Sequence, residues 1–248
     1  MKKILVGTPI CESKFYSWIE YSKAISELIV PDGVELIYYV VDTSDDPSLK
    51  IELACKNSTL EHYRLNLSYC WITADKPMDK VVLARNKIRE YAQIIKADYI
   101  LFIDSDIVVP PNALQRLLTM LGQFDPYWSV ITGCYITTTS KGIPTPCAKL
   151  WTKIGYMDFP ENYINGKVWS VDMTGLGCTL VPKQIFGLFK FRCIRDTEGK
   201  LIASEDTCFF NDISTQRFIL QQVKVLFDTG LDINHIIGGS FSWDPDTA

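Results

Sequence analysis

The sequence predicts an α/β fold in which a mostly parallel, Rossmann-like sheet is flanked by helices. Short apolar runs typical of buried strands alternate with runs of helical periodicity through the first half of the chain. The 248 residues, 47% of them hydrophobic, suffice for one substantial core, and no linker or internal repeat divides them. We therefore expect a single domain over residues 1–248.

The first half of the chain contains four strand predictions separated by helices. The predicted strands cover residues 4–6, 34–41, 69–73 and 99–103. A first helix is expected from six apolar residues on one face: Phe15, Trp18, Ile19, Ile25, Leu28 and Ile29. A second helix is expected within residues 48–65, and a third from Asp79, as its N-cap, to Lys96.

The second half becomes irregular beyond about residue 125. A helix is expected to start at residues 110–112 and continue to Leu121. Later elements are expected as strands at 128–135, 168–171, 178–181 and 223–227 and as helices at 182–189 and 205–216. Between them lie a Gly/Pro/Thr-rich loop at 137–146 and an aromatic stretch at 151–163, and long loops of this kind usually carry function or disorder.

Composition narrows the class of protein. The net charge is -4, and the basic residues are scattered, so the sequence lacks the basic patch of a nucleic-acid-binding protein. No apolar run approaches the roughly 18 residues of a membrane span, and the one at residues 4–6 is too short for a signal peptide. The eight cysteines form no C-x-x-C pair, which favours buried free thiols. We expect a soluble cytoplasmic protein, with peripheral membrane contact left open.

The most informative motif is Asp104-Ser105-Asp106, which directly follows the predicted strand at residues 99–103. The carboxyl ends of strands are where open α/β sheets bind ligands. On an extended backbone, carboxylates at i and i+2 point to one side, so Asp104 and Asp106 could share one hard divalent cation. The alternative is that one carboxylate caps a turn and the other is solvated.

Three further places could carry chemistry. Glu205 and Asp206 open a predicted helix, where acidic residues are also common because of the helix dipole. His235 follows the last predicted strand, and a lone histidine is more often structural than a ligand. Arg85, next to Asn86, suits a diphosphate or a base edge, with a surface salt bridge to a residue such as Glu90 as the alternative.

Taken in order, these motifs resemble those of the GT-A glycosyltransferases (the nucleotide-diphospho-sugar transferase fold), most closely the large inverting family 2. The resemblance covers nearly the whole chain up to a tail at residues 239–248. It runs through Gly7-Thr8-Pro9, Val41-Asp42, Ala84-Arg85-Asn86, the D-x-D motif, residues 175–182, Ser204-Glu205-Asp206-Thr207 and His235. Two departures stand out: Asp42 has no second acid beside it, and Ile10-Cys11-Glu12 replaces a usual Tyr-Asn pair.

The resemblance implies a donor-binding half at about residues 1–110 and an acceptor and catalytic half at about 111–238. Asp104 and Asp106 would hold Mn²⁺ or Mg²⁺ against the diphosphate of a UDP- or GDP-sugar, with Ser105 also at the donor and His235 as a further metal or phosphate contact. The other donor contacts would be Thr8, Pro9 and Asp42 in the nucleoside pocket and Arg85 at the base or diphosphate.

The implied reaction is a hexosyltransferase-like transfer to a hydroxyl of a glycan, lipid or protein, with inversion. Asp206 would be the general base and Glu205 a supporting residue. Five aromatic residues in the irregular half are candidates for acceptor contacts, although core packing is the more common role of such side chains. They are Trp151, Tyr156, Phe159, Tyr163 and Trp169. Gly175 and Gly177 would either let backbone approach a ligand or form a tight turn.

Other functions remain open from the sequence. A sugar-phosphate nucleotidyltransferase shares the alternating pattern and a metal-binding acid, but residues 7–12 lack its Gly-rich basic loop. An aspartyl-nucleophile phosphatase usually places D-x-D after its first strand, whereas here several strands precede it. A non-catalytic nucleotide- or glycan-binding module with a GT-A-like fold is the third alternative.

Overall fold

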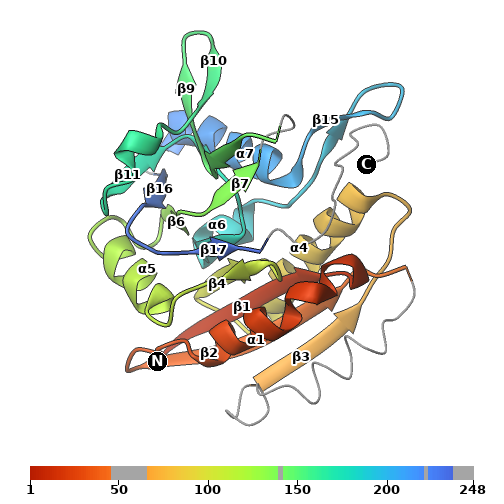
Figure 1. Cartoon of the computed structure of the whole chain (residues 1–248), viewed down its shortest axis with the longest axis vertical. Helices are drawn as coiled ribbons and strands as arrows, with labels where there is room; N and C mark the ends of the chain where they lie inside the picture. Colours follow the sequence, from red (N-terminus) through yellow and green to blue (C-terminus); the bar gives the residue numbers. More distant parts are fainter. Residues whose placement is uncertain (46–65, 139–141, 221–222, 237–248) are drawn as a thin grey trace.

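A computed structural model describes residues 1–45, 66–138, 142–220 and 223–236 and confirms the predicted α/β architecture (Figure 1). Its centre is an eight-stranded sheet in the order β11-β16-β6-β13-β4-β1-β2-β3. Strands β1, β2, β3, β4, β6 and β16 point one way, whereas β13 and β11 run against them. The sheet is therefore mostly parallel, as expected.

The first half of the sheet contains all four predicted strands, although β1 is longer than predicted and β3 begins three residues earlier. Its strands are β1 (Lys2–Ile10), β2 (Val34–Asp42), β3 (Asn66–Trp71) and β4 (Tyr99–Ile103). Pairing of Ile10 with Asp42 and of Asp42 with Trp71 aligns the carboxyl ends of β1, β2 and β3. The residues that follow these strands therefore gather at one edge of the sheet.

Helices cover both faces of this half. Thr8 on β1 contacts Tyr21 of α1 (Trp18–Ser26), and a Cβ on the preceding residue, Gly7, would meet Ile88 of α4 (Pro77–Ile94). Neighbouring residues of a strand point to opposite faces, so α1 and α4 lie on opposite sides of the sheet. This arrangement buries all of β4 and residues 4–8 of β1.

The helix predicted from Phe15 is divided into two parts. A 3₁₀ segment, η1 (Glu12–Ser17), precedes α1. Within α1 the buried spacing is Trp18, Tyr21 and Ile25, whereas Ile19 is 76% exposed. The prediction that Ile19 lies on the buried face was therefore wrong, because the buried face of α1 passes through Trp18, Tyr21 and Ile25.

Helix α4 starts three residues earlier than predicted. Its N-cap is Lys76, with Pro77 in the first turn, so Asp79 is not the N-cap. The Asp79 carboxylate instead accepts a hydrogen bond of 3.2 Å from Arg195. The helix predicted within residues 48–65 and the tail predicted at 239–248 lie outside the described residues.

The second half contains more strand than the sequence predicted. The remaining elements of the large sheet are β6 (Ser129–Gly133), β11 (Val168–Val171), β13 (Cys178–Pro182) and β16 (Lys224–Asp228). The aromatic stretch, expected to be irregular, forms a hairpin of β9 (Ala148–Thr152) and β10 (Gly155–Asp158) that projects at the top of Figure 1. Part of the predicted loop pairs as β7 (Ile136–Thr138) with β8 (Pro144–Pro146).

Further helices and short strands are found among the described residues. The helices are α5 (Ala113–Leu121), α6 (Lys183–Leu188), α7 (Glu205–Leu220) and the 3₁₀ segment η2 (Glu161–Tyr163). The short strands are β5 (Ile107–Val108), β12 (Met173–Thr174), β14 (Ile194–Arg195), β15 (Leu201–Ala203) and β17 (Asn234–His235). Among the described residues, no helix has the length and apolar character needed to cross a membrane.

Candidate active site

The D-x-D motif forms a turn rather than a continuation of β4. The backbone N–H of Ile107 donates to the carbonyl of Asp104 at 2.9 Å, and the N–H of Asp104 donates to the carbonyl of Gly177 at 2.9 Å. The extended backbone on which the same-side argument for the two carboxylates rested is thus absent. We call residues 104–107 the acidic turn, and its two carboxylates have different cationic partners.

Asp104 faces the helices α4 and α7. Its Oδ1 lies 2.7 Å from Nη2 of Arg85, whose side chain is only 3% exposed. The guanidinium also lies 5.0 Å from the centre of the Phe102 ring and 3.9 Å, through Nε, from Oε1 of Glu205. The alternative of a surface salt bridge with Glu90 is therefore wrong, and Arg85 links the acidic turn to the start of α7.

This group of charges, in which Arg85 is 3% and Asp104 is 29% exposed, is incompletely hydrogen-bonded. The Arg85–Asp104 contact has the distance of an ion pair but lacks hydrogen-bond geometry. Within the described part of the chain, Oδ1 of Asp104 and Nε and Nη1 of Arg85 therefore have no hydrogen-bond partner. Buried polar atoms are normally satisfied, so these atoms have capacity for a ligand.

The carboxyl groups on this side hold protons more tightly than usual. Burial raises the pKa of Asp104, although the positive charge of Arg85 opposes the shift. Burial, and then the negative charge of Asp206, raises the pKa of Glu205 to about 7. Low local polarity thus dominates the ionisation of both groups.

Asp106 faces η1 and β17. Its Oδ2 accepts a hydrogen bond of 2.7 Å from Nζ of Lys14 and lies 3.4 Å from Nε2 of His235. Burial alone would raise the pKa of Asp106, but hydrogen bonds from His235 and Lys14 and their charges outweigh it and lower the pKa to about 2. Asp106 is therefore held as a carboxylate by two partners.

The two-stranded β5–β17 ribbon brings His235 to the acidic turn. Residues of β17 pair with β5, so that His235 stands opposite Ile107, and the N–H of Ile236 donates to the carbonyl of Asp106 at 2.8 Å. The Nδ1 atom of His235 lies 3.1 Å from the carbonyl oxygen of Ile136. When Nδ1–H of a neutral histidine donates to a backbone carbonyl, the ring lone pair lies on Nε2, which is the usual arrangement of a metal-ligating imidazole.

The donor atoms at the acidic turn fit a divalent cation. Two carboxylates and an imidazole suit Mn²⁺ or Mg²⁺, and the unsatisfied Oδ1 of Asp104 is one available oxygen. In the described residues, however, no three His, Cys, Asp or Glu side chains are clustered closely enough to hold an ion. The ligand set is therefore chemically suitable but not assembled, because Arg85 and Lys14 contact the two carboxylates.

Asp206 lies in the first turn of α7, next to Glu205. Its Oδ1 accepts hydrogen bonds from the Ser204 hydroxyl and from the Thr207 N–H, the latter at 2.6 Å. Among the described residues, nothing donates to Oδ2. One carboxylate oxygen is thus fixed by the local backbone and the other is available for a proton.

Comparison with known proteins identifies the fold. No family model and no curated protein matches the sequence. The chain resembles the solved structure of S. aureus TarS 1-349 in complex with UDP-GlcNAc, with a TM-score of 0.55 and 14% identity over 98% of this chain and 61% of that one. It also resembles GalNAc-T7 with UDP, GalNAc and Mn²⁺, with a TM-score of 0.60 and 10% identity over 99% of this chain and 46% of that one. The fold is that of the GT-A glycosyltransferases.

At these identities the likeness establishes the fold alone. The chain spans less than two thirds of each of these two structures, at 61% and 46% of their lengths. The resemblance to family 2 in particular stays a prediction, as does the division into a donor half and an acceptor half.

The residues predicted for a nucleoside pocket are largely engaged with the protein. The Thr8 hydroxyl is buried against the Tyr21 hydroxyl. The Asp42 carboxylate is fully buried and accepts hydrogen bonds from the Ser44 N–H and hydroxyl, at 2.9 and 2.6 Å, and from the Tyr69 hydroxyl at 2.8 Å. Asp42 therefore shapes the turn after β2. Pro9, the penultimate residue of β1, is half-buried.

The predicted glycines and Asn86 prove to have packing roles. A Cβ on Gly177 would lie 2.8 Å from the Tyr135 hydroxyl, which accepts a hydrogen bond of 3.0 Å from the Gly177 N–H. A Cβ on Gly175 would collide with the same hydroxyl. The Asn86 amide exchanges hydrogen bonds with the backbone of Phe191 at 2.8 and 3.1 Å, so Asn86 fixes α4 to the segment after α6.

The five aromatic residues divide into two groups. Phe159, Tyr163 and Trp169 contact one another edge to face; Phe159 is 3% exposed and packs in the core, whereas Tyr163 is 43% exposed. Trp151 and Tyr156 pair across the hairpin and are 63% and 38% exposed. The Tyr156 hydroxyl donates to Asn211 of α7 at 2.6 Å, which ties the hairpin to the helix that carries Asp206.

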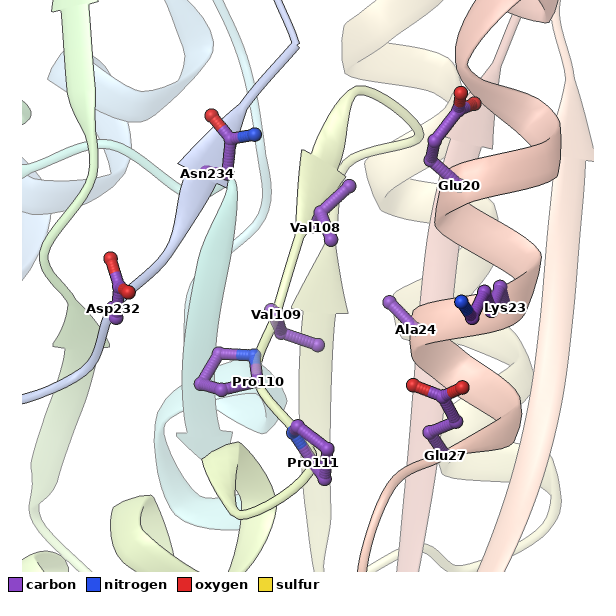
Figure 2. A pocket seen from close by; sticks show the side chains of 10 residues that line it. All are labelled: Glu20, Lys23, Ala24, Glu27, Val108, Val109, Pro110, Pro111, Asp232 and Asn234. Carbon is purple, nitrogen blue, oxygen red and sulfur yellow. The ribbon is translucent and has the colours of Figure 1, made fainter.

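A groove of about 400 Å³ lies between α1 and the β5–β17 ribbon and is open to solvent (Figure 2). Figure 2 shows charged side chains of α1 facing the segment after β5 and the strand β17. Its lining residues are Glu20, Lys23, Ala24, Glu27, Val108, Val109, Pro110, Pro111, Asp232 and Asn234. None of the predicted site residues lines this groove, so it is separate from the acidic turn.

Sequence reasoning missed Lys14, Tyr135 and Tyr69 as parts of the site. Lys14 is one of many scattered lysines, and its contact with Asp106 joins residues 92 positions apart. Its position just after β1, at the carboxyl edge of a parallel sheet, was the available signal. Tyr135 and Tyr69 lie in apolar strand-like runs, where an aromatic residue is expected for packing alone.

Proposed function

We propose that this protein is a glycosyltransferase that moves a sugar from a UDP- or GDP-sugar to an acceptor hydroxyl with inversion, assisted by Mn²⁺ or Mg²⁺. The carrying observation is the convergence of Asp104, Asp106, Arg85, Glu205 and His235 on the acidic turn of a GT-A fold. The neighbouring structures, which contain UDP-GlcNAc or UDP with Mn²⁺, support a nucleoside-diphosphate sugar as the donor.

The donor diphosphate is assigned to the acidic turn. Negative charge accumulates on phosphate oxygens as the glycosidic bond to the diphosphate breaks, and a divalent cation, when bound, stabilises that charge. Asp104, Asp106 and His235 would hold the ion through oxygen and nitrogen donors. Arg85 offers two unsatisfied N–H groups, which suit a phosphate or sugar oxygen.

Asp206 is assigned as the general base for the acceptor. An acceptor hydroxyl is a weak nucleophile at neutral pH, so removal of its proton by a positioned carboxylate accelerates attack. The Asp206 Oδ1 is held by Ser204 and Thr207, which leaves Oδ2 for the proton. Glu205, with a pKa raised to about 7, would be protonated in about half of the molecules at pH 7, and that form can donate a hydrogen bond to the sugar or acceptor.

The acceptor is assigned to the side of the β9–β10 hairpin. Trp151 and Tyr156 offer exposed aromatic faces there, and Tyr156 is tied to α7 through Asn211. Aromatic faces suit the apolar face of a sugar ring or of an aglycone. A glycan, lipid or protein acceptor is compatible with this surface.

The test is nucleoside diphosphate release from a panel of UDP- and GDP-sugars, with Mn²⁺ or Mg²⁺ and with EDTA as the control. We expect metal-dependent release from at least one donor, with product anomeric configuration opposite to that of the donor by NMR. Pyrophosphate release from a nucleoside triphosphate and a sugar phosphate would instead indicate the nucleotidyltransferase. Donor binding without release would indicate the non-catalytic module.

A further inference from the structure

Lys14 brings a positive charge to one of the two carboxylates of the acidic turn. Its Nζ lies 2.7 Å from Oδ2 of Asp106, and the two side chains are 31% and 11% exposed. An ammonium group therefore contacts the same oxygen that a divalent cation would use. Two cations do not share one carboxylate oxygen without strong mutual repulsion.

The position of Lys14 is fixed by the segment that carries it. In η1, the buried Ser17 hydroxyl lies 2.8 Å from the carbonyl oxygen of Ser105 and 2.6 Å from that of Lys14. The Tyr16 hydroxyl donates at 3.2 Å to the carbonyl of Ile236, the residue that follows His235. Both contacts fasten η1 to the two segments that supply Asp106 and His235, so the Lys14 contact is built into the site.

We propose that Lys14 competes with the divalent cation for Asp106 and, once displaced, contacts the diphosphate of the donor. This inference rests on the proposed function, since it assigns the same carboxylate to a metal. Lysine suits the task because its ammonium is a point charge on a flexible four-carbon chain. Its partly exposed side chain has room to leave Asp106 while the backbone of η1 stays in place.

The competition couples the metal to the donor. Without a donor, the cation binds only the fraction of molecules in which Asp106 is released, which lowers its apparent affinity. A donor supplies phosphate oxygens as new partners for Lys14 and so lowers the cost of releasing Asp106. By linkage the cation must raise donor affinity by the same factor. The site therefore favours the cation and the donor together over either alone.

The experiment measures Mn²⁺ binding to the full chain by electron paramagnetic resonance, with and without UDP. The variants are Lys14→Met and Lys14→Gln, which remove the charge, and Lys14→Arg, which keeps it. The matched control is Lys23→Met, an exposed lysine of the neighbouring helix α1 outside the acidic turn.

We expect both charge-removing variants to bind Mn²⁺ at least about fivefold more tightly than the natural protein when UDP is absent, the lower end of typical coupling between sites. They should also gain less Mn²⁺ affinity from added UDP. Lys14→Arg and Lys23→Met should bind Mn²⁺ as the natural protein does.

Two outcomes separate the inference from the function on which it rests. If Mn²⁺ binds the natural protein and the folded Lys14→Met and Lys14→Gln variants equally, or the variants more weakly, Lys14 is not a competitor and the metal site stands. If no sample binds Mn²⁺ with or without UDP, the metal-dependent function is wrong and the role of Lys14 falls with it.

Discussion

The two sides of the acidic turn are built differently. The Asp104 side is formed by α4, a helix of 18 residues, and α7, a helix of 16 residues. The Asp106 side is formed by η1, of six residues, and β17, of two. Long helices with many packed residues hold a side chain in one place, whereas short segments adjust at lower cost. Long helices therefore position Arg85 and Glu205 near Asp104, whereas short segments position Lys14 and His235, the partners of Asp106.

The cations on the two sides match this difference. Arg85 is 3% exposed and stacked over Phe102, whereas Lys14 is 31% exposed. A buried guanidinium is always charged and cannot leave without loss of packing, while a partly exposed ammonium moves into water readily. We therefore propose that the Asp104 side orients the reactants and carries the chemical step. Exchange between cations would occur on the Asp106 side.

The largest effect is expected on the Asp104 side, from Asp206→Asn. Loss of the proposed general base should lower the transfer rate by about 10²- to 10⁴-fold, with donor and Mn²⁺ affinity unchanged. The measurement is initial-rate kinetics with parallel donor binding by calorimetry. Asp212→Asn, on the same helix α7 and in an exposed pair with Arg192, is the control. If Asp206→Asn kept the full transfer rate, Asp206 would not be the general base.

Asp104→Asn and Asp106→Asn test the comparison directly through stability. Removing Asp104 leaves the buried Arg85 with only the more distant Glu205, so we expect a loss of about 3–5 kcal/mol in the free energy of unfolding. Removing Asp106 leaves a lysine that reaches water, so we expect a loss of about 1 kcal/mol.

Urea unfolding followed by circular dichroism measures both values. Equal losses would show that the two sides do not differ in rigidity. Both variants should also lose Mn²⁺ binding. Asp104 and Asp106 would then share the role of metal ligand while differing in their contribution to stability.

Glu205 provides a pH test of the buried side. Because burial raises its pKa to about 7 in the folded chain, the folded state binds more protons than the unfolded state between pH 4.5 and 7. The contribution of Glu205 to stability is therefore fully present below about pH 4.5 and is lost as the pH rises through about 7, by up to about 3 kcal/mol.

Glu205→Gln should remove this dependence. The stability of the variant relative to the natural protein should rise between pH 5 and pH 8 in urea unfolding experiments. A pH-independent difference between the two proteins would mean that Glu205 is not held in a medium of low polarity.

The smallest effect is expected far from the acidic turn, at the hairpin. Trp151→Ala should raise the KM for the acceptor by about two- to tenfold, the range of one aromatic contact, with the KM for the donor unchanged. Since Trp151 is 63% exposed, the fold should tolerate the change. Ile154→Ala, at the tip of the same hairpin and 99% exposed, is the control. An unchanged acceptor KM would place the acceptor elsewhere.

The sequence predicted the fold where local pattern and burial coincide. The strand at Tyr99–Ile103 is entirely apolar and entirely buried, and it was found with the same bounds. The β9–β10 hairpin was missed because its outward strand positions carry Trp151 and Tyr156, which removes the alternation of apolar and polar residues. Ile19 was misassigned because the change from η1 to α1 shifts the helical face.

The sequence predicted which residues form the site but not which of them contact one another. Acidic residues after a buried strand indicate a ligand edge, which placed Asp104 and Asp106 correctly after β4. Their partners come from distant parts of the chain, with 129 positions between Asp106 and His235, and depend on how η1 and β17 fold back. No local pattern encodes that choice, so the division of the carboxylates between Arg85 and Lys14 required the structure.

The reversed direction of β13 has a consequence for how such a protein could diversify. Cys178, at the start of β13, pairs with Ile103 at the end of β4, so the loop before β13 enters the sheet beside Asp104. A parallel strand would place that loop at the opposite edge. Changes in its length or sequence therefore reach the edge that carries the acidic turn without touching β1, β2 or β3. In the proposed transferase, acceptor preference thus has a route to diverge while the proposed donor-binding half stays unchanged.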